Sequence, residues 1–189
     1  MINIILNWLR IQGYVNESND KIIELGLQRI RSTLACILFS LIISWLMGDI
    51  IVGLIFKLTY IPIRIYAGGY HANSKRRCNY LSYGSMMICM ILIFYVPMKI
   101  VLMNLLLLFS VIIIFLFSPI ESPNKRLNSG ERNEFRRKSI IYLAIIVITY
   151  VTLIKIKKFI YAKTIIHSIT LIAIGLLIPS RGLKSDANK

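Results

Sequence analysis

The sequence predicts an all-α, polytopic integral membrane protein with about six transmembrane helices, preceded by an amphipathic helix at the membrane interface. Two observations favour this class. Hydrophobic residues make up 57% of the chain and the mean hydropathy is +0.70, whereas soluble domains use about 45–50% apolar residues. The apolar residues also gather in long runs, and a membrane-spanning helix needs about 20 of them. With 189 residues, residues 1–189 are expected to form a single domain.

The N-terminal segment predicts a helix that lies in the membrane interface. Within residues 1–13, the apolar residues Ile2, Ile5, Leu6 and Leu9 repeat at helical spacing. The segment is too short to span a bilayer and lacks the small-residue cleavage site of a secretory signal. An amphipathic interfacial helix fits these features.

The next elements predict a helical hairpin. Residues 18–32 read as a helix that leads into a first apolar run at 33–47. A second run at 50–63 is short and contains Lys57 and Pro62, so this arm is a less certain span. The expected count is therefore six spans, or four if the hairpin does not cross fully.

A polar break then precedes four clearer spans. Residues 64–78 interrupt the apolar pattern, and residues 118–138 form the only long polar loop expected. A polar tail begins at Ser180. The remaining spans are expected at 79–96, 100–117, 139–154 and 159–178.

The basic residues predict the orientation of the chain. The net charge is +15, from 23 Lys and Arg against 8 Asp and Glu, but these residues lie between apolar runs and no domain remains to bind nucleic acid. With six spans most of them share one side of the membrane. The opposite side carries only Lys99, Lys155, Lys157 and Lys158. The positive-inside rule then places both termini on the cytoplasmic side of the membrane.

The cysteine and histidine pattern predicts neither a disulfide framework nor a metal site. Cys36, Cys78 and Cys89 are an odd number without a CxxC pair, and the chain has no HExxH motif. Cys36 and Cys89 lie within apolar runs, where free cysteine behaves as a small hydrophobe. No metal or cofactor is therefore expected.

Polar residues within the spans have structural explanations. His167, with Ser168 and Thr170 beside it, is expected to form hydrogen bonds between helices. Lys57 and Lys163 can extend toward an interface.

His71 and Cys78 are the only histidine and cysteine that lie close together at a membrane boundary. A thiol nucleophile needs a base or a positive environment that stabilises its thiolate. On one continuous helix the two residues would be about 10.5 Å apart, too far for a hydrogen bond, so a catalytic pair requires a break between them. Gly68-Gly69 can supply this break. An ordinary positive loop with an incidental histidine and cysteine remains the alternative.

A new helix is expected to begin just before the cysteine. Asn73 or Ser74 can cap a helix that enters the bilayer. Cys78 would then lie just past its first turn, where the helix dipole, Arg76 and Arg77 favour a thiolate.

Two separated motifs resemble the AgrB family of bacterial quorum-sensing membrane peptidases. The first comprises Arg64, the run Ala67-Gly68-Gly69-Tyr70-His71-Ala72, and Cys78. The second is the run SPIESPNK at residues 118–125, which is similar to the proline-containing basic loop of that family. Chain length and the order of the hydrophobic segments agree as well, so the resemblance covers nearly the whole chain.

The resemblance implies a cysteine endopeptidase with Cys78 as nucleophile and His71 as general base. It would cleave the C-terminal tail from a short amphipathic AgrD-like propeptide and promote its cyclisation to a thiolactone autoinducing peptide. A homodimer is also implied as possible. The candidate substrate-binding residues are Arg64, Gly68, Gly69, Glu121, Lys125 and Arg126.

The basic residues beyond the first motif have two interpretations. They could hold the acidic tail that the family's propeptides tend to have, or they could serve topology alone. These residues are Lys125, Arg126, Arg136, Arg137 and Lys138.

Two other functional classes compete with the peptidase. A small transporter or peptide exporter should place polar residues in several spans, but only Lys57, Lys163 and His167 stand out in these spans. A non-catalytic scaffold for a signalling kinase is the third hypothesis.

Overall fold

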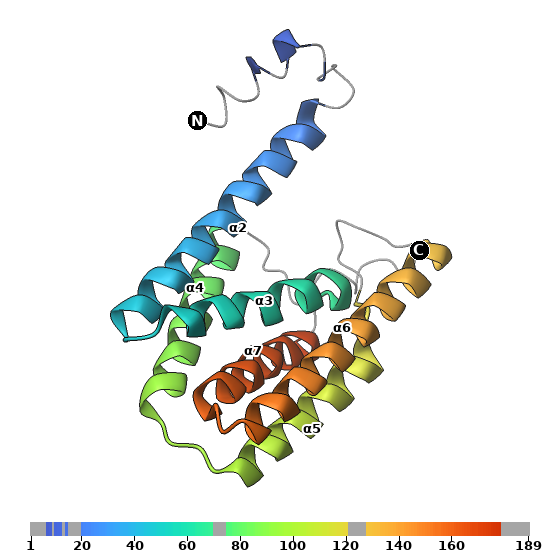
Figure 1. The fold of residues 1–189 in the computed structure, drawn as a ribbon. Coiled ribbons are helices and arrows are strands. Elements are labelled where there is room, and N and C mark those ends of the chain that lie inside the picture. Colours follow the sequence, from blue (N-terminus) through green and yellow to red (C-terminus); the bar gives the residue numbers. More distant parts are fainter. Residues whose placement is uncertain are drawn as a thin grey trace. The chain divides into compact units, whose positions relative to one another are not determined.

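The computed structural model describes residues 7, 8, 10–12, 14, 20–69, 75–120 and 128–178. It divides the chain into two compact units, Met1–Phe39 and Ser40–Lys189. Six helices are each long and apolar enough to cross a membrane (Figure 1), which confirms the predicted fold class and count. They are α2 (Asp20–Leu46), α3 (Ile50–Ala67), α4 (Lys75–Tyr95), α5 (Ile100–Phe117), α6 (Ser129–Lys155) and α7 (Phe159–Leu177).

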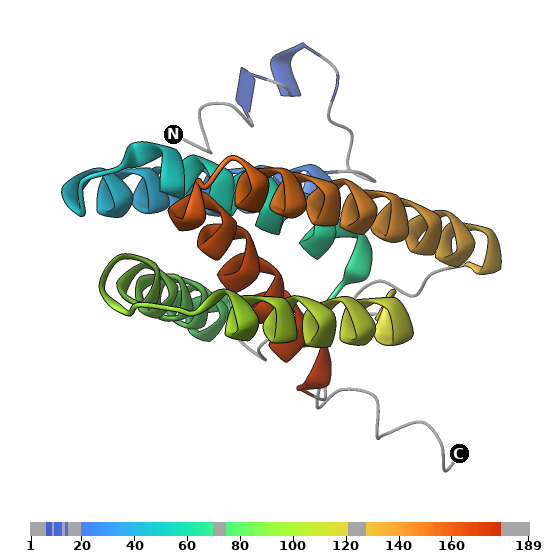
Figure 2. The ribbon, with the colours of Figure 1, turned by 60° about the horizontal axis from the view of Figure 1, so that its bottom comes forward.

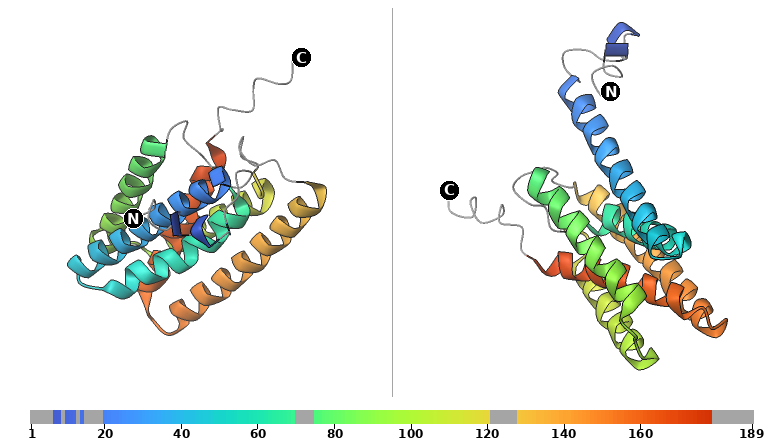
Figure 3. Two further views of the ribbon diagram at one scale, coloured as in Figure 1. Left: turned by 90° about the horizontal axis from the view of Figure 1, so that it is seen from above. Right: turned by 90° about the vertical axis from the view of Figure 1, so that its left-hand side faces the viewer.

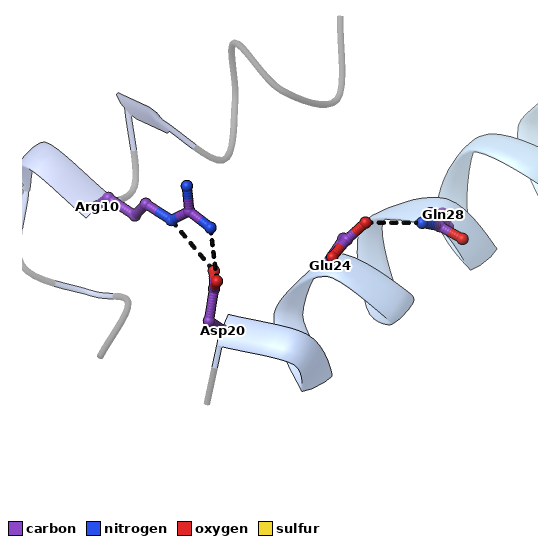
Figure 4. Close-up of polar contacts among 4 residues, drawn as sticks. All are labelled: Arg10, Asp20, Glu24 and Gln28. Atoms are coloured by element: carbon purple, nitrogen blue, oxygen red, sulfur yellow. Dashed lines mark hydrogen bonds and ion pairs between the residues drawn. The ribbon is translucent and has the colours of Figure 1, made fainter. Parts of the chain in front are cut away.

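The first unit contains the beginning of α2 and the described part of the predicted interfacial helix. Asn7, Trp8, Arg10 and Ile11 are helical, in agreement with the sequence prediction of a helix there. Arg10 donates two hydrogen bonds to the carboxylate of Asp20, at 3.1 and 2.5 Å (Figure 4). Asp20 opens α2, where the helix dipole favours an acidic residue.

The second unit is organised around α7, which contacts α3, α4, α5 and α6. Figure 2 shows α7 crossing obliquely between α3 and α6 on one side and α4 and α5 on the other. The right-hand view of Figure 3 shows α4 lying across it. Every residue from Ala162 to Ile169 is buried, which is the pattern of a helix surrounded by others.

The other helices expose much of their apolar surface, as expected where lipid is the solvent. On α5, whose mean hydropathy is the highest of the six, only Met103, Ser110 and Ile114 are buried. These three residues repeat at spacings of seven and four, so they line the face toward α7. The remaining apolar face is available to the bilayer.

The helices of the second unit alternate in direction. The end of α3 contacts the start of α6, since Tyr66 packs on Phe135 and Tyr142. At the opposite end, Lys163 near the start of α7 bonds the last carbonyls of α4. The second hairpin arm, whose crossing was uncertain from the sequence, is the helix α3, which is long and apolar enough to cross a membrane.

The predicted polar loop at 118–138 is too long, because α6 begins at Ser129. The Asn128 N–H donates to the Glu131 carboxylate at 3.1 Å, which is half of a capping box. One turn later, Lys138 pairs with Glu134 at 2.5 Å with helical i,i+4 spacing. Charged residues that looked like a loop therefore form the first turns of a long helix.

The polar break predicted at 64–78 is also shorter than expected. The α3 helix passes through Pro62 and ends at Ala67, and α4 begins at Lys75. Proline removes only the one hydrogen bond to the carbonyl four residues before it. The irregular connection therefore begins at Gly68.

Polar side chains within the spans mostly bond inside or between these helices. Ser110 and Thr170 share a hydrogen bond of 3.0 Å between α5 and α7, and Tyr150 donates to Asn104 Oδ1 at 2.7 Å. His167 differs from the prediction, because its Nδ1 atom lies 2.9 Å from the Lys163 carbonyl of its own helix. Of the predicted interhelical group, the threonine makes the bond between helices.

Candidate functional site

The candidate site begins where α3 ends in two glycines. Gly68 has φ 77° and Gly69 has φ 131°, both in the region that side-chain-bearing residues rarely adopt. Gly68 is the C-cap of α3. The two residues therefore turn the chain sharply away from the helix immediately before Tyr70 and His71.

Arg64 holds this turn in place. Its Nη1 atom donates to the carbonyl of Gly68 at 2.7 Å, which satisfies an acceptor at the helix end. A Cβ atom on Gly69 would collide with the same Nη1 and lie 2.9 Å from Cζ. The guanidinium thus occupies the space that a side chain at position 69 would need.

The turn is also bonded to the segment that follows α5. The Ile120 N–H donates to the Ala67 carbonyl at 2.9 Å, and a Cβ on Gly68 would collide with the Ile120 carbonyl oxygen. The peptide bond between Ser118 and Pro119 is cis. The described parts of the two resembling motifs, about fifty positions apart in the sequence, therefore touch through their backbones.

The start of α6 completes this end of the unit. The buried Ser118 hydroxyl donates to Ser139 Oγ at 3.0 Å. Tyr66 stacks on Tyr142 with ring centroids 5.5 Å apart, and Phe135 meets Tyr66 edge-on at 5.5 Å. These contacts hold α3 and α6 together beside the turn.

Of the basic residues on α6, Lys138 has intramolecular partners. Its Nζ atom lies 5.5 Å from the centre of the Tyr66 ring and pairs with Glu134. Arg136 and Arg137 are exposed. With the exposed Arg132, the start of α6 therefore presents three arginine side chains to the surroundings, while Lys138 contributes to packing.

Cys78 is the fourth residue of α4. Its thiol is free and half-buried, and its backbone carbonyl accepts a hydrogen bond from Ser82 Oγ at 2.9 Å. The described part of α4 begins at Lys75, so Cys78 lies near its start, while the predicted caps Asn73 and Ser74 lie outside the described residues. Cys36 and Cys89 are free as well, and Cys89 is buried among apolar residues.

Several predicted site residues lie outside the described residues. They are His71, Asn73, Ser74, Glu121, Lys125 and Arg126. The structure therefore brings together Arg64, Gly68 and Gly69, and it places Cys78 separately on α4. Among the described residues, no group of three or more histidine, cysteine or acidic side chains could hold a metal ion.

The accessory gene regulator B family model matches residues 2–176 of the 189-residue chain. The chain belongs to the AgrB family. This gives it a role in the processing of accessory gene regulator quorum-sensing peptides, with an AgrD-like propeptide as partner. Its six apolar helices make it a multi-pass membrane protein. The searches of curated proteins and of solved structures found no match.

Sequence reasoning missed the aromatic contacts and the serine pair at this end of the unit. Tyr66 follows Arg64 by two positions, but nothing in a lone tyrosine indicates a partner on α6. Ser139 was read as the first residue of an apolar run. The one available signal was Asn128 with Glu131 three positions later, which marks a helix start and brings α6 close to the turn.

Proposed function

We propose that this AgrB-family chain is a membrane-embedded cysteine endopeptidase in which Cys78 is the nucleophile and His71 the general base. It cleaves the C-terminal tail from an AgrD-like propeptide and promotes closure of the released peptide into a thiolactone. Residues 1–189 act as one peptidase domain. Both termini lie in the cytoplasm of a bacterial cell, because the basic residues gather on that side.

The observation that carries the proposal is the break between α3 and α4. The helix α3 ends at Ala67, and Gly68 and Gly69, both with positive φ, follow it directly before Tyr70 and His71, whereas Cys78 lies near the described start of α4. The proposed pair requires such a break, because a straight helix would hold the two residues about 10.5 Å apart. The Cys78 thiol is free and half-buried near the described start of α4.

The proposed reaction proceeds in two acyl transfers. The Cys78 thiolate attacks the scissile carbonyl, and the proton taken by His71 passes to the departing amine of the tail. The peptide is then held as a thioester on Cys78. A cysteine of the peptide gives its thiol proton to His71 and attacks this thioester, which forms the thiolactone and releases the Cys78 thiolate. Because one thioester replaces another, the acyl group stays activated as long as water is excluded.

The turn before His71 has an organising part in this proposal. Arg64 and the two glycines fix the backbone through the Gly68 carbonyl and the contact with Ile120. We propose that they act on the substrate by shaping the segment that presents His71. Glu121, Lys125 and Arg126 lie within the six positions after Ile120 and are proposed substrate contacts, together with the exposed Arg136 and Arg137 for an acidic tail.

The test is cleavage of a synthetic AgrD-type propeptide, with an internal cysteine and an acidic tail, by the full chain in liposomes. Cys78→Ala and His71→Ala should each abolish tail release while leaving membrane insertion intact. Cys89→Ala is the matched control, because Cys89 is a buried thiol on the same helix. Tail release by Cys78→Ala at the wild-type rate would overturn the proposal.

An intermediate gives a second readout. Mass spectrometry of a reaction with a propeptide whose cysteine is replaced by serine should show an acylated chain, because the weaker nucleophile slows the second transfer. A transporter without proteolytic activity would instead move the intact propeptide across the bilayer in both the wild-type and the Cys78→Ala protein.

A further inference from the structure

The helix that carries Cys78 makes its main contacts with a single neighbour, α7. Among the α4 residues whose burial is described, only Met86, Cys89, Met90 and Ile93 are buried. These lie in the second half of the helix, away from Cys78. The position of the thiol therefore depends on how the far end of α4 is held.

That far end lacks one of its own backbone hydrogen bonds. The Val96 N–H donates to the Leu92 carbonyl at 3.3 Å. The next carbonyl in the series, that of Ile93, would need an N–H at position 97, and Pro97 has none. In an apolar surrounding an unsatisfied carbonyl is costly, so this acceptor needs a donor from elsewhere.

Lys163 of α7 supplies the donor. Its Nζ atom donates to the Ile93 carbonyl at 2.7 Å and also to the Val96 carbonyl. The side chain is only 9% exposed, although lysine is rarely buried. A cation at this place also complements the negative end of the α4 dipole.

We propose that Lys163 is a positioning residue that fixes α4, and with it Cys78, for the acyl-transfer reaction. This inference rests on the proposed function. The bonded carbonyl of Ile93 lies about 22 Å along the helix from Cys78 at about 1.5 Å per residue. A tilt of about 5° at the Lys163 contact would thus move the thiol by about 2 Å, and a misplacement of about 1 Å can cost about a hundredfold in rate.

The experiment compares three variants of the full chain in liposomes, with the same synthetic propeptide as substrate. Lys163→Met keeps the apolar stem and removes the donor, whereas Lys163→Arg keeps a charged donor. Thr164→Val is the matched control, since Thr164 is also buried on α7 but bonds the Ile160 carbonyl of its own helix at 2.8 Å.

We expect Lys163→Met to lower kcat at least about tenfold, equivalent to about 1.4 kcal/mol in the barrier. KM should stay near the wild-type value, because the residue is far from the substrate. Lys163→Arg should restore most of kcat, and Thr164→Val should behave as wild type. A purely structural role would lower the amount of folded protein instead, with unchanged kcat per folded molecule.

Hydrogen exchange at the amides of the last turn of α4 reports on the contact between Lys163 and the end of α4, independently of the cleavage reaction. Lys163→Met should exchange about tenfold faster there, because the turn frays. Faster exchange with unchanged kcat would overturn the positioning role. Unchanged exchange would show that Lys163 does not stabilise the end of α4. Cleavage by Cys78→Ala would overturn the proposed function, and the exchange measurement is independent of that result. Should Lys163→Met not insert, Lys163→Gln, which keeps a donor without the charge, takes its place and should show a smaller effect of the same kind.

Discussion

The carboxyl ends of α3 and α4 solve the same problem in different ways. Both helices leave carbonyl groups without intrahelical donors, and both place a cation there. At α3 the cation is Arg64 of the same helix, which bonds Gly68 four residues later. At α4 it is Lys163, which comes from α7 and lies 70 positions away from Ile93. The contact at α3 is therefore local in the sequence, whereas the contact at α4 is a tertiary contact between two helices.

The two devices have different consequences for the candidate site. Arg64 acts directly on the residues that precede His71, and the Ile120 backbone packs against the same turn at Ala67 and Gly68. Lys163 acts on a helix whose other end carries Cys78. The turn that precedes His71 and the helix that carries Cys78 are therefore held by separate means, the first by packing at the end of α3 and the second by a contact with α7.

The largest expected effect comes from breaking the turn at α3 with Gly69→Ala. The added Cβ would meet the Arg64 guanidinium, and alanine is strained at φ 131°. We expect cleavage of the propeptide to fall at least about a hundredfold, since the conflict lies two residues from His71. Tail release by purified protein in liposomes measures this.

Gly84→Ala is the control for that substitution. Gly84 lies on α4, and a Cβ there would have no atom within 4 Å. Its activity should be close to wild type. Wild-type cleavage by Gly69→Ala would contradict the role assigned to the turn.

The contrast between the two helix ends also explains how much could be read from the sequence. The spans were predictable because about 20 apolar residues in a row have one explanation in a membrane protein. The turn at Gly68-Gly69 was predictable as a break because paired glycines punctuate helices. Features that depend on neighbouring residues, such as apolar runs and paired glycines, can therefore be recognised in the sequence.

The rest required contacts between segments distant in the sequence. The sequence shows Lys163 only as a lysine near the end of a predicted helix, and its neighbouring residues do not indicate that it bonds the Ile93 carbonyl. The same is true of Tyr66, whose partners lie on α6. Even the α6 start was missed because its charged turns look like a solvated loop until the Asn128–Glu131 pair is read as a cap.

A smaller effect is expected from Arg64→Met, which removes the donor at α3 and keeps the apolar stem. The Gly68 carbonyl then loses its partner, which should lower the free energy of unfolding by about 1–3 kcal/mol. Thermal unfolding in detergent should show a lower Tm. Arg132→Met, at an exposed position on α6, should leave Tm nearly unchanged, and equal shifts in both variants would indicate a general charge effect.

The smallest effect tests whether Lys163 of α7 replaces the backbone N–H donor that Pro97 lacks at the end of α4. In Pro97→Ala the new N–H can bond the Ile93 carbonyl, so the carbonyl needs Lys163 less. The cost of Lys163→Met in unfolding free energy should then be about 1 kcal/mol smaller in the Pro97→Ala background than in the wild type. A double-mutant cycle by thermal unfolding measures this coupling. Strict additivity would show that Lys163 serves the Val96 carbonyl or the helix dipole alone, whereas a positive coupling ties the lysine to the proline as one tertiary capping device.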